Sequence, residues 1–241
     1  MGRHYGDIER IDPKKVKDFF NRRTADEKNP LNAVMLQNAA SNLPAQKDEY
    51  EKTHLLPSWP SPARIFEIGC GAGRLAAHYL AAGHSYVGID FSESMVDLAR
   101  KTYAGQKAYF EVAAVPDVDP TKLPLTPPYQ LILVSALCLY LNDSDVTAML
   151  KLIGKCADKP AVVYIRESLS ELDRRLTLRD FYSEELKADY NAIYRTVPEF
   201  TKLCEDGLGP SGFKLEKTDY AFPPEMRQRS ETVQYYYLFR R

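Results

Sequence analysis

An apolar run at residues 64–68 leads directly into three alternating glycines, Gly69, Gly71 and Gly73. Glycine carries no Cβ, so a loop of this composition can turn sharply and lets a ligand come close to the backbone. A second apolar strand ends in Asp90, whose carboxylate suits hydrogen bonding to a ribose diol. Together these residues predict a site for a nucleoside-containing cofactor.

The glycine spacing distinguishes between nucleoside cofactors. A dinucleotide fingerprint reads G-x-G-x-x-G and places a pyrophosphate on a helix N-terminus. Here the spacing is G-x-G-x-G, and Arg74 takes the place of the third glycine. Glu67 lies two positions before the loop, where its carboxylate would repel a pyrophosphate and attract an ammonium group. S-adenosylmethionine has an α-ammonium, a sulfonium and a ribose diol, and it carries no phosphate.

The run Glu67-Ile-Gly-Cys-Gly-Ala-Gly73 resembles the first motif of the class I S-adenosylmethionine-dependent methyltransferases, (D/E)-x-G-x-G-x-G. The resemblance extends, more weakly, over residues 60–241. It implies that S-adenosylmethionine is the cofactor and S-adenosylhomocysteine the product. It also implies a Rossmann-like α/β fold with a seven-stranded, doubly wound and mostly parallel sheet, in which the last strand is antiparallel.

The same resemblance implies roles for individual residues. The glycines line the methionine and ribose, Asp90 accepts hydrogen bonds from the ribose hydroxyls, and Glu67 lies near the ammonium group. Phe91 and Met95 pack against the adenine. Many members carry an acidic pair after the third strand; here Asp117 is the candidate, and a backbone contact is the alternative. The predicted cofactor-binding residues are Glu67, Gly69, Cys70, Gly71, Gly73, Asp90, Phe91, Met95, Asp117 and Ser135.

Strands and helices alternate between residues 64 and 165, which predicts a parallel sheet with helices on both faces. Ligands bind outside the carboxyl ends of such strands. The glycine loop, Asp90 and the residues that follow the later strands should therefore open into one cleft. The predicted strands are residues 64–68, 86–89, 108–112, 129–134 and 161–165, followed by 213–220 and 232–239.

Two segments lie outside this alternation. Residues 1–57 read as an N-terminal helical arm or cap, with helices that begin near Asp12, Asn29 and Gln46. Within residues 168–195, Ser168 and Glu171 have capping-box spacing, which predicts a helical insertion over the active site. The remaining residues, 58–241, form the predicted methyltransferase core.

Candidate catalytic residues are Arg166 and Glu167, which end the fifth predicted strand beside the cofactor, and His54 in the N-terminal arm. An alcohol acceptor needs a general base, whereas an amine needs only to arrive unprotonated. The alternative interpretation of Arg166 and Glu167 is an ion pair that anchors the insertion.

Candidate acceptor-binding residues are polar and aromatic: Tyr140, Tyr190, Tyr194 and Arg195. Tyrosine combines a large apolar body with a hydroxyl that can bond a ligand. The alternative is that the tyrosines of the insertion simply pack on the core.

Composition excludes several other classes. The chain has 241 residues, a formal net charge of −1 and no apolar run near the ~20 residues that span a bilayer, so neither a nucleic acid nor a membrane is an expected partner. The four cysteines are scattered and show no metal-ligand spacing, which predicts no metal site and reduced thiols in a cytoplasmic protein. The expected partner is a small-molecule substrate, bound by a monomer or homodimer.

We therefore expect a methyltransferase that acts on a hydroxyl, or an amine, of a small polar metabolite such as a sugar or a specialised metabolite. The alternatives are an NAD-dependent oxidoreductase, a tRNA or protein methyltransferase, and a catalytically silent binding protein.

Overall fold

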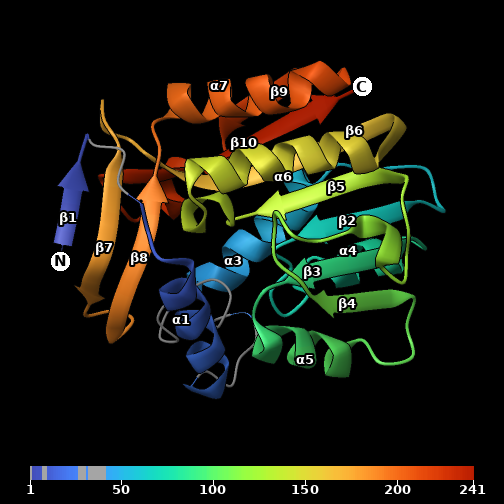
Figure 1. Ribbon diagram of the computed structural model, residues 1–241, viewed down its shortest axis with the longest axis horizontal. Helices are drawn as coiled ribbons and strands as arrows, with labels where there is room; N and C mark the ends of the chain where they lie inside the picture. The colour runs from blue at the N-terminus through green and yellow to red at the C-terminus, as the bar shows by residue number, and fades with distance from the viewer. Residues whose placement is uncertain (1, 7–9, 27–30, 32–41) are drawn as a thin grey trace.

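Seven strands form one sheet through the centre of the structure (Figure 1). The computed structural model describes residues 2–6, 10–26, 31 and 42–241. The strand order is β4-β3-β2-β5-β6-β10-β9. The strands are β2 (Arg64–Ile68), β3 (Ser85–Asp90), β4 (Ala108–Val112), β5 (Tyr129–Ser135), β6 (Ala157–Ser170), β9 (Lys214–Tyr220) and β10 (Thr232–Arg240).

The direction of the strands confirms the expected class of fold. Strands β4, β3, β2, β5 and β6 run parallel to their neighbours. Strand β10 is antiparallel to both β6 and β9. Residues 131–134 of β5 are buried throughout, because helices cover both faces of a parallel sheet. This explains why β5 reads as a continuous apolar run.

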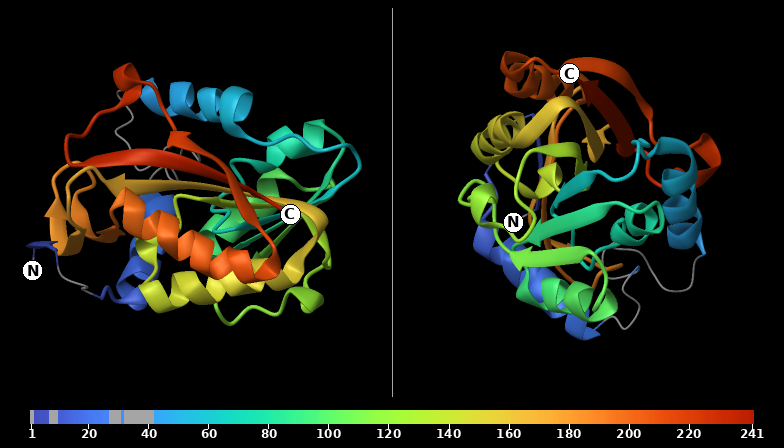
Figure 2. Two further views of the ribbon diagram at one scale, coloured as in Figure 1. Left: turned by 90° about the horizontal axis from the view of Figure 1, so that it is seen from above. Right: turned by 90° about the vertical axis from the view of Figure 1, so that its right-hand side faces the viewer.

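A layer of helices covers each face of the sheet. Successive side chains of a strand point to opposite faces, so each strand packs against both layers. Phe66 packs in one buried cluster with α6 (Asp143–Cys156) and α7 (Val197–Leu208). Its neighbour Ile65 packs on the other face with α4 (Ala76–Ala81) and α5 (Glu93–Thr102). Figure 2 shows α6 and α7 on one side of the sheet and α4 on the other.

Side chains cap the first turn of two helices. Ser92 caps α5 by accepting a hydrogen bond from the Met95 backbone N–H. Thr196 and Glu199 form a reciprocal capping box at the start of α7, which satisfies backbone donors that have no partner inside the helix. Both caps join residues only three positions apart in the chain.

Residues 168–195 form strands joined by short connections, and the prediction of a helical insertion there is wrong. Strand β6 continues to Ser170, and the segment then forms β7 (Leu176–Ser183) and β8 (Ala188–Tyr194). These two strands pair antiparallel, and β7 pairs also with β1 (Gly2–Tyr5).

Pairing partners far away in the chain explain this error. Ser168 lies opposite Gln234 of β10, so its backbone bonds to another strand and the capping-box spacing has no helix to cap. Leu176, Thr177 and Leu178 are all buried, so this part of β7 lacks the strict alternation that marks a half-buried strand in a sequence. Tertiary context overrides local propensity here.

The cap, defined here as β1, β7, β8 and α1 (Pro13–Asp26), therefore mixes strands and a helix. Its interior is an apolar cluster that includes Phe19, Leu176 and Ile193. In Figure 1 the cap stands beside the sheet, with α1 next to β8. The expected all-helical arm is corrected accordingly, since residues 2–5 form an edge strand of this second sheet.

The remaining N-terminal segment is helical as expected. Helix α3 (Leu43–Tyr50) continues into a π-helical turn, η1 (Glu51–Leu55). Leu55 packs on the face of the sheet that α4 covers. The helix predicted to begin at Asn29 lies outside the described residues.

Candidate active site

The glycine loop between β2 and α4 is held in a conformation that requires glycine. Gly69, Gly71 and Gly73 have φ angles of +75°, +52° and +79°, a region that side-chain-bearing residues rarely adopt. The backbone N–H groups of Gly69 and Cys70 both donate to the carbonyl of Ile89, at 2.8 and 3.0 Å. The loop is thus tied to the end of β3, next to Asp90.

Gly73 packs against aromatic side chains and does not line the cavity described below. A Cβ at this position would lie 2.8 Å from Tyr103 Cε2 and 3.0 Å from Phe110 Cε1. Tyr103 donates its hydroxyl to the Gly73 carbonyl at 2.8 Å. The structure therefore gives Gly73 a packing role, whereas Gly69 and Gly71 line the cavity.

The two carboxylate oxygens of Asp90 bind two different backbone N–H groups. Oδ2 accepts from the Gly71 N–H and Oδ1 from the Ser92 N–H, both at 2.9 Å. Each oxygen keeps a lone pair for a further donor. Burial raises the pKa of Asp90 to about 6, although these backbone donors lower it. The carboxylate is positioned to accept hydrogen bonds from a diol.

Glu67 is a buried carboxylate at the floor of the same region. It accepts a hydrogen bond from the hydroxyl of Tyr86, and it lines the cavity. Burial raises its pKa to about 8, with the Tyr86 hydroxyl acting in the opposite direction. A cationic group placed beside Glu67 would favour its charged form, so this residue suits an ammonium ligand.

The other predicted cofactor residues meet around the same space. Cys70, Phe91, Met95, Asp117 and Ser135 all line the cavity. The loop after β4, residues 113–117, contributes small side chains and Asp117 to its wall. A carboxylate for a diol, a carboxylate for an ammonium group and an apolar wall fit S-adenosylmethionine.

The cavity has a volume of about 480 Å³ and extends from the glycine loop to the cap. On the cap side its walls are mostly aromatic and aliphatic: Phe20, Tyr140, Leu178, Phe181, Leu186, Tyr190 and Tyr194. The hydroxyls of Tyr140 and Tyr190 lie 2.7 Å apart. Burial raises the pKa of both tyrosines, so they stay neutral and can donate or accept hydrogen bonds.

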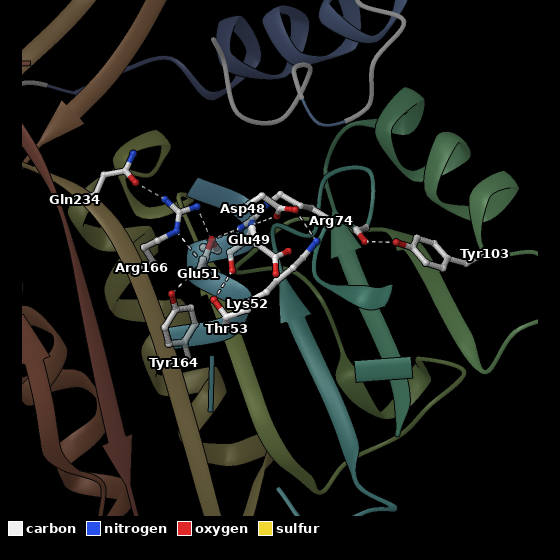
Figure 3. Close-up of polar contacts among 12 residues, drawn as sticks. Asp48, Glu49, Glu51, Lys52, Thr53, Arg74, Tyr103, Tyr164, Arg166 and Gln234 are labelled. Carbon is white, nitrogen blue, oxygen red and sulfur yellow. Dashed lines mark hydrogen bonds and ion pairs between the residues drawn. The ribbon is translucent and has the colours of Figure 1, made fainter. Parts of the chain in front are cut away.

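Arg166 lines the cavity. Its side chain belongs to a buried network of hydrogen bonds and ion pairs (Figure 3). Its guanidinium donates to Glu51 Oε1, Gln234 Oε1 and Ser135 Oγ, each at 2.8 Å. Tyr164 donates to the same Glu51 oxygen at 2.9 Å. Arg166 thereby joins the N-terminal segment, β5 and β10 at one point.

A second arginine completes this network. Arg74 pairs with Glu51 at 2.8 Å and with Asp48 at 2.7 Å, and Asp48 also pairs with Lys52. Figure 3 shows these residues gathered where α3 meets the sheet. Burial on its own would raise the pKa of Glu51, but the guanidiniums of Arg166 and Arg74 lower it to about 2.

Besides Gly73, three predicted site residues lie outside the cavity. Glu167 is buried away from the cavity, where it accepts from the backbone N–H groups of Cys138 and Ser168. Arg195 binds Asp143 and the carbonyls of Cys138 and Leu141. His54 is exposed and stacks on Tyr50. None of the three lines the cavity, so Glu167 and Arg195 are anchoring residues.

Sequence reasoning missed Glu51, Asp48 and Gln234, because an acidic residue on a polar helix is ordinarily solvated. Arg74, a charged residue in place of the third glycine, was the one sequence feature that pointed to a charged network at this position. In the described part of the chain, no cluster of three or more His, Cys, Asp or Glu side chains is arranged to hold a metal ion. No described helix is long and apolar enough to cross a membrane.

Comparison with known proteins gives the class. Residues 65–159 match the sequence family described as "Methyltransferase domain", and no curated protein matches the chain. A Leishmania major S-adenosylmethionine-dependent methyltransferase is 18% identical, with a TM-score of 0.65, covering 94% of this chain and 82% of the other. The Synechocystis magnesium protoporphyrin IX methyltransferase with bound S-adenosylmethionine is 17% identical, with a TM-score of 0.57, covering 98% and 99%.

A third similar structure is phosphoethanolamine N-methyltransferase 1 of Haemonchus contortus, in complex with phosphoethanolamine and S-adenosylhomocysteine. It is 19% identical, with a TM-score of 0.71, and the match covers 95% of this chain and 48% of that protein. Residues 65–159 thus match a methyltransferase domain, and the described chain shares its fold with these S-adenosylmethionine-dependent methyltransferases. The match to a methyltransferase family favours the expected class over the alternative of an NAD-dependent oxidoreductase.

Proposed function

We propose that this protein transfers a methyl group to a small-molecule acceptor that binds between the glycine loop and the cap. The observation that carries the proposal is the continuity of the cavity. Asp90 and the glycines line one end, and Tyr140 and Tyr190 line the other. A donor at the first end and an acceptor at the second would share one enclosed space.

The cofactor residues would hold the donor in one orientation. We propose that Asp90 binds the ribose hydroxyls, that Glu67 faces the α-ammonium and that Phe91 and Met95 contact the adenine. When bound, S-adenosylmethionine supplies an electrophilic methyl group on its sulfonium. Methyl transfer is an in-line displacement, so this chain contributes mainly by aligning the acceptor and excluding water.

The acceptor end favours a molecule with an apolar or aromatic body. Its walls carry more aromatic and aliphatic than charged side chains, which differs from the surface that a free sugar would need. We propose a hydroxyl or an amine as the methylated atom, with the Tyr140–Tyr190 pair as its hydrogen-bond partner. None of the four histidines lines the cavity, so an acceptor that needs little help from a base fits best.

The chain divides into a catalytic core and the segments that close it. We propose residues 58–241 without β7 and β8 as the catalytic core, with the cap and α3 closing its carboxyl edge. The four cysteines are buried and free, which supports a reducing, cytoplasmic location. Whether the protein is a monomer or a homodimer stays a prediction.

The test is a transfer experiment with methyl-labelled S-adenosylmethionine and an extract of source cells, after which the label is separated by size. We expect label in the small-molecule fraction, and much less of it with an Asp90→Ala variant at the same, subsaturating concentration of S-adenosylmethionine. Label on tRNA or on protein would overturn the proposed substrate class. Cofactor binding without any transfer would indicate a silent binding protein.

A further inference from the structure

The cavity has a cationic end next to the loop between β9 and β10. Lys47 of α3 lines it and is only 5% exposed. Arg227 and Arg229 line it from the loop. The ammonium group of Lys47 lies over the ring of Phe222, 5.4 Å from its centroid. Burying a lysine in this way is costly unless an anion balances it.

The charge balance around this end is incomplete. Glu51 and Asp48 neutralise Arg166 and Arg74, and Glu185 pairs with Arg229 at 2.7 Å. Among the contacts of the described residues, neither Lys47 nor Arg227 has a carboxylate partner. Arg227 instead donates to the Phe222 carbonyl at 3.1 Å and stacks on the ring of Tyr220. Burial lowers the pKa of Lys47 to about 8, and the charges of Arg166 and Arg229 act in the same direction.

Three of the four acidic residues that line the cavity lie at the other end: Glu67, Asp90 and Asp117 belong to or follow β2, β3 and β4. The fourth, Asp145, lies in the first turn of α6, which packs on the opposite face of the sheet from Phe222. Lys47, by contrast, is next to Phe222, close to β6 and β10. In the strand order, β6 and β10 lie on the opposite side of β2 from β3 and β4. The unbalanced positive charge therefore belongs to the acceptor side.

We propose that Lys47 and Arg227 form a subsite for an anionic group, a carboxylate or a phosphate, carried by the methyl acceptor. The proposal rests on the proposed function and adds a substrate class to it: an acceptor with an apolar body and a negative end. Gln234 adds a donor, because its side-chain oxygen is used by Arg166 and its NH₂ group remains. Charge-assisted hydrogen bonds of this kind are strong and directional.

A matched pair of probes tests the charge preference. We would titrate 4-hydroxybenzoate and 4-hydroxybenzyl alcohol into protein saturated with S-adenosylhomocysteine and measure both dissociation constants by calorimetry. The carboxylate should bind at least about tenfold more tightly than the alcohol, as charged hydrogen bonds predict. Lys47→Met should abolish this preference and Lys47→Arg should restore most of it. Lys151→Met, on the exposed side of α6, should leave it unchanged.

Each other outcome has a defined meaning. Equal binding of the two probes by the wild type, or a preference that survives Lys47→Met, would overturn the proposal. A Lys47→Met variant with weakened S-adenosylhomocysteine binding and an intact probe preference would assign Lys47 to the carboxylate of the cofactor instead. The proposed function fails separately, if no labelled methyl group reaches any small molecule. Thermal unfolding of each variant confirms that it is folded.

Discussion

Glu51 and Arg166 are 115 residues apart in the chain, and their side chains share a 2.8 Å hydrogen bond in the interior. Both are almost completely buried. The pair connects η1 to the carboxyl end of β6, where Arg166 lines the cavity. The N-terminal segment is thus attached to the catalytic core by charge, next to the proposed acceptor site.

The first prediction concerns this pair. Glu51→Gln leaves Arg166 and Arg74 buried with less compensation, and breaking a buried ion pair costs about 3–5 kcal/mol. We expect a loss of that size in the free energy of unfolding, measured with urea. Glu49→Gln on the same helix changes an exposed carboxylate and should cost less than about 0.5 kcal/mol. Equal effects of the two substitutions would contradict the role given to Glu51.

The pH dependence of the Glu51 effect has a definite sign. Its pKa of about 2 in the folded protein lies below the ordinary value of 4.5. The charged form therefore stabilises the fold above pH 4.5, and this contribution is lost as the pH falls towards 2. The difference between wild type and Glu51→Gln should shrink over that window.

A second prediction concerns Asp90. Asp90→Ala should weaken S-adenosylmethionine binding by one to two orders of magnitude, since hydrogen bonds to a charged group contribute about 1.5–3 kcal/mol. Part of the loss would come from the Gly71 N–H, which Asp90 holds. Calorimetry measures the affinity, with the exposed Asp97→Ala as the control. Unchanged affinity in a folded Asp90 variant would refute the site assignment.

Glu67 gives a third prediction, opposite in sign to that of Glu51. Burial raises its pKa from 4.5 to about 8. A raised pKa means that its contribution to stability is fully present below pH 4.5 and is lost as the pH rises to 8. In protein without cofactor, the wild type should lose stability relative to Glu67→Gln, by up to about 1.4 kcal/mol per pH unit. Glu205→Gln, an exposed site, should show no such slope.

The fourth prediction separates backbone conformation from packing. Gly73 and Gly105 share a φ of +79°, but only at Gly73 would an added Cβ lie within 3.0 Å of aromatic carbons. Gly105→Ala should cost about 1 kcal/mol for its backbone conformation. Gly73→Ala should cost about 1–3 kcal/mol more, because Tyr103 and Phe110 must move. Unfolding in urea measures both; similar losses would show that the loop tolerates the methyl group.

Some features of the site could be predicted because they depend on neighbours in the chain. The glycine loop, Glu67 and Asp90 stand at the ends of two successive strands, and parallel strands bring their carboxyl ends to one edge. The Thr196–Glu199 capping box is equally local. Residues with a role in packing, such as Gly73, look the same in the sequence as residues that face a ligand.

The sequence by itself therefore determined the class of fold and predicted the glycine loop together with Glu67 and Asp90. Only the tertiary structure decided the nature of the cap and the acceptor side of the cavity. Residues 2–5 pair with residues 176–179, and Glu51 meets Arg166, so neither contact leaves a local pattern. The glycine motif can be read from seven consecutive residues. A buried ion pair can be identified only when the fold has brought its two distant partners together.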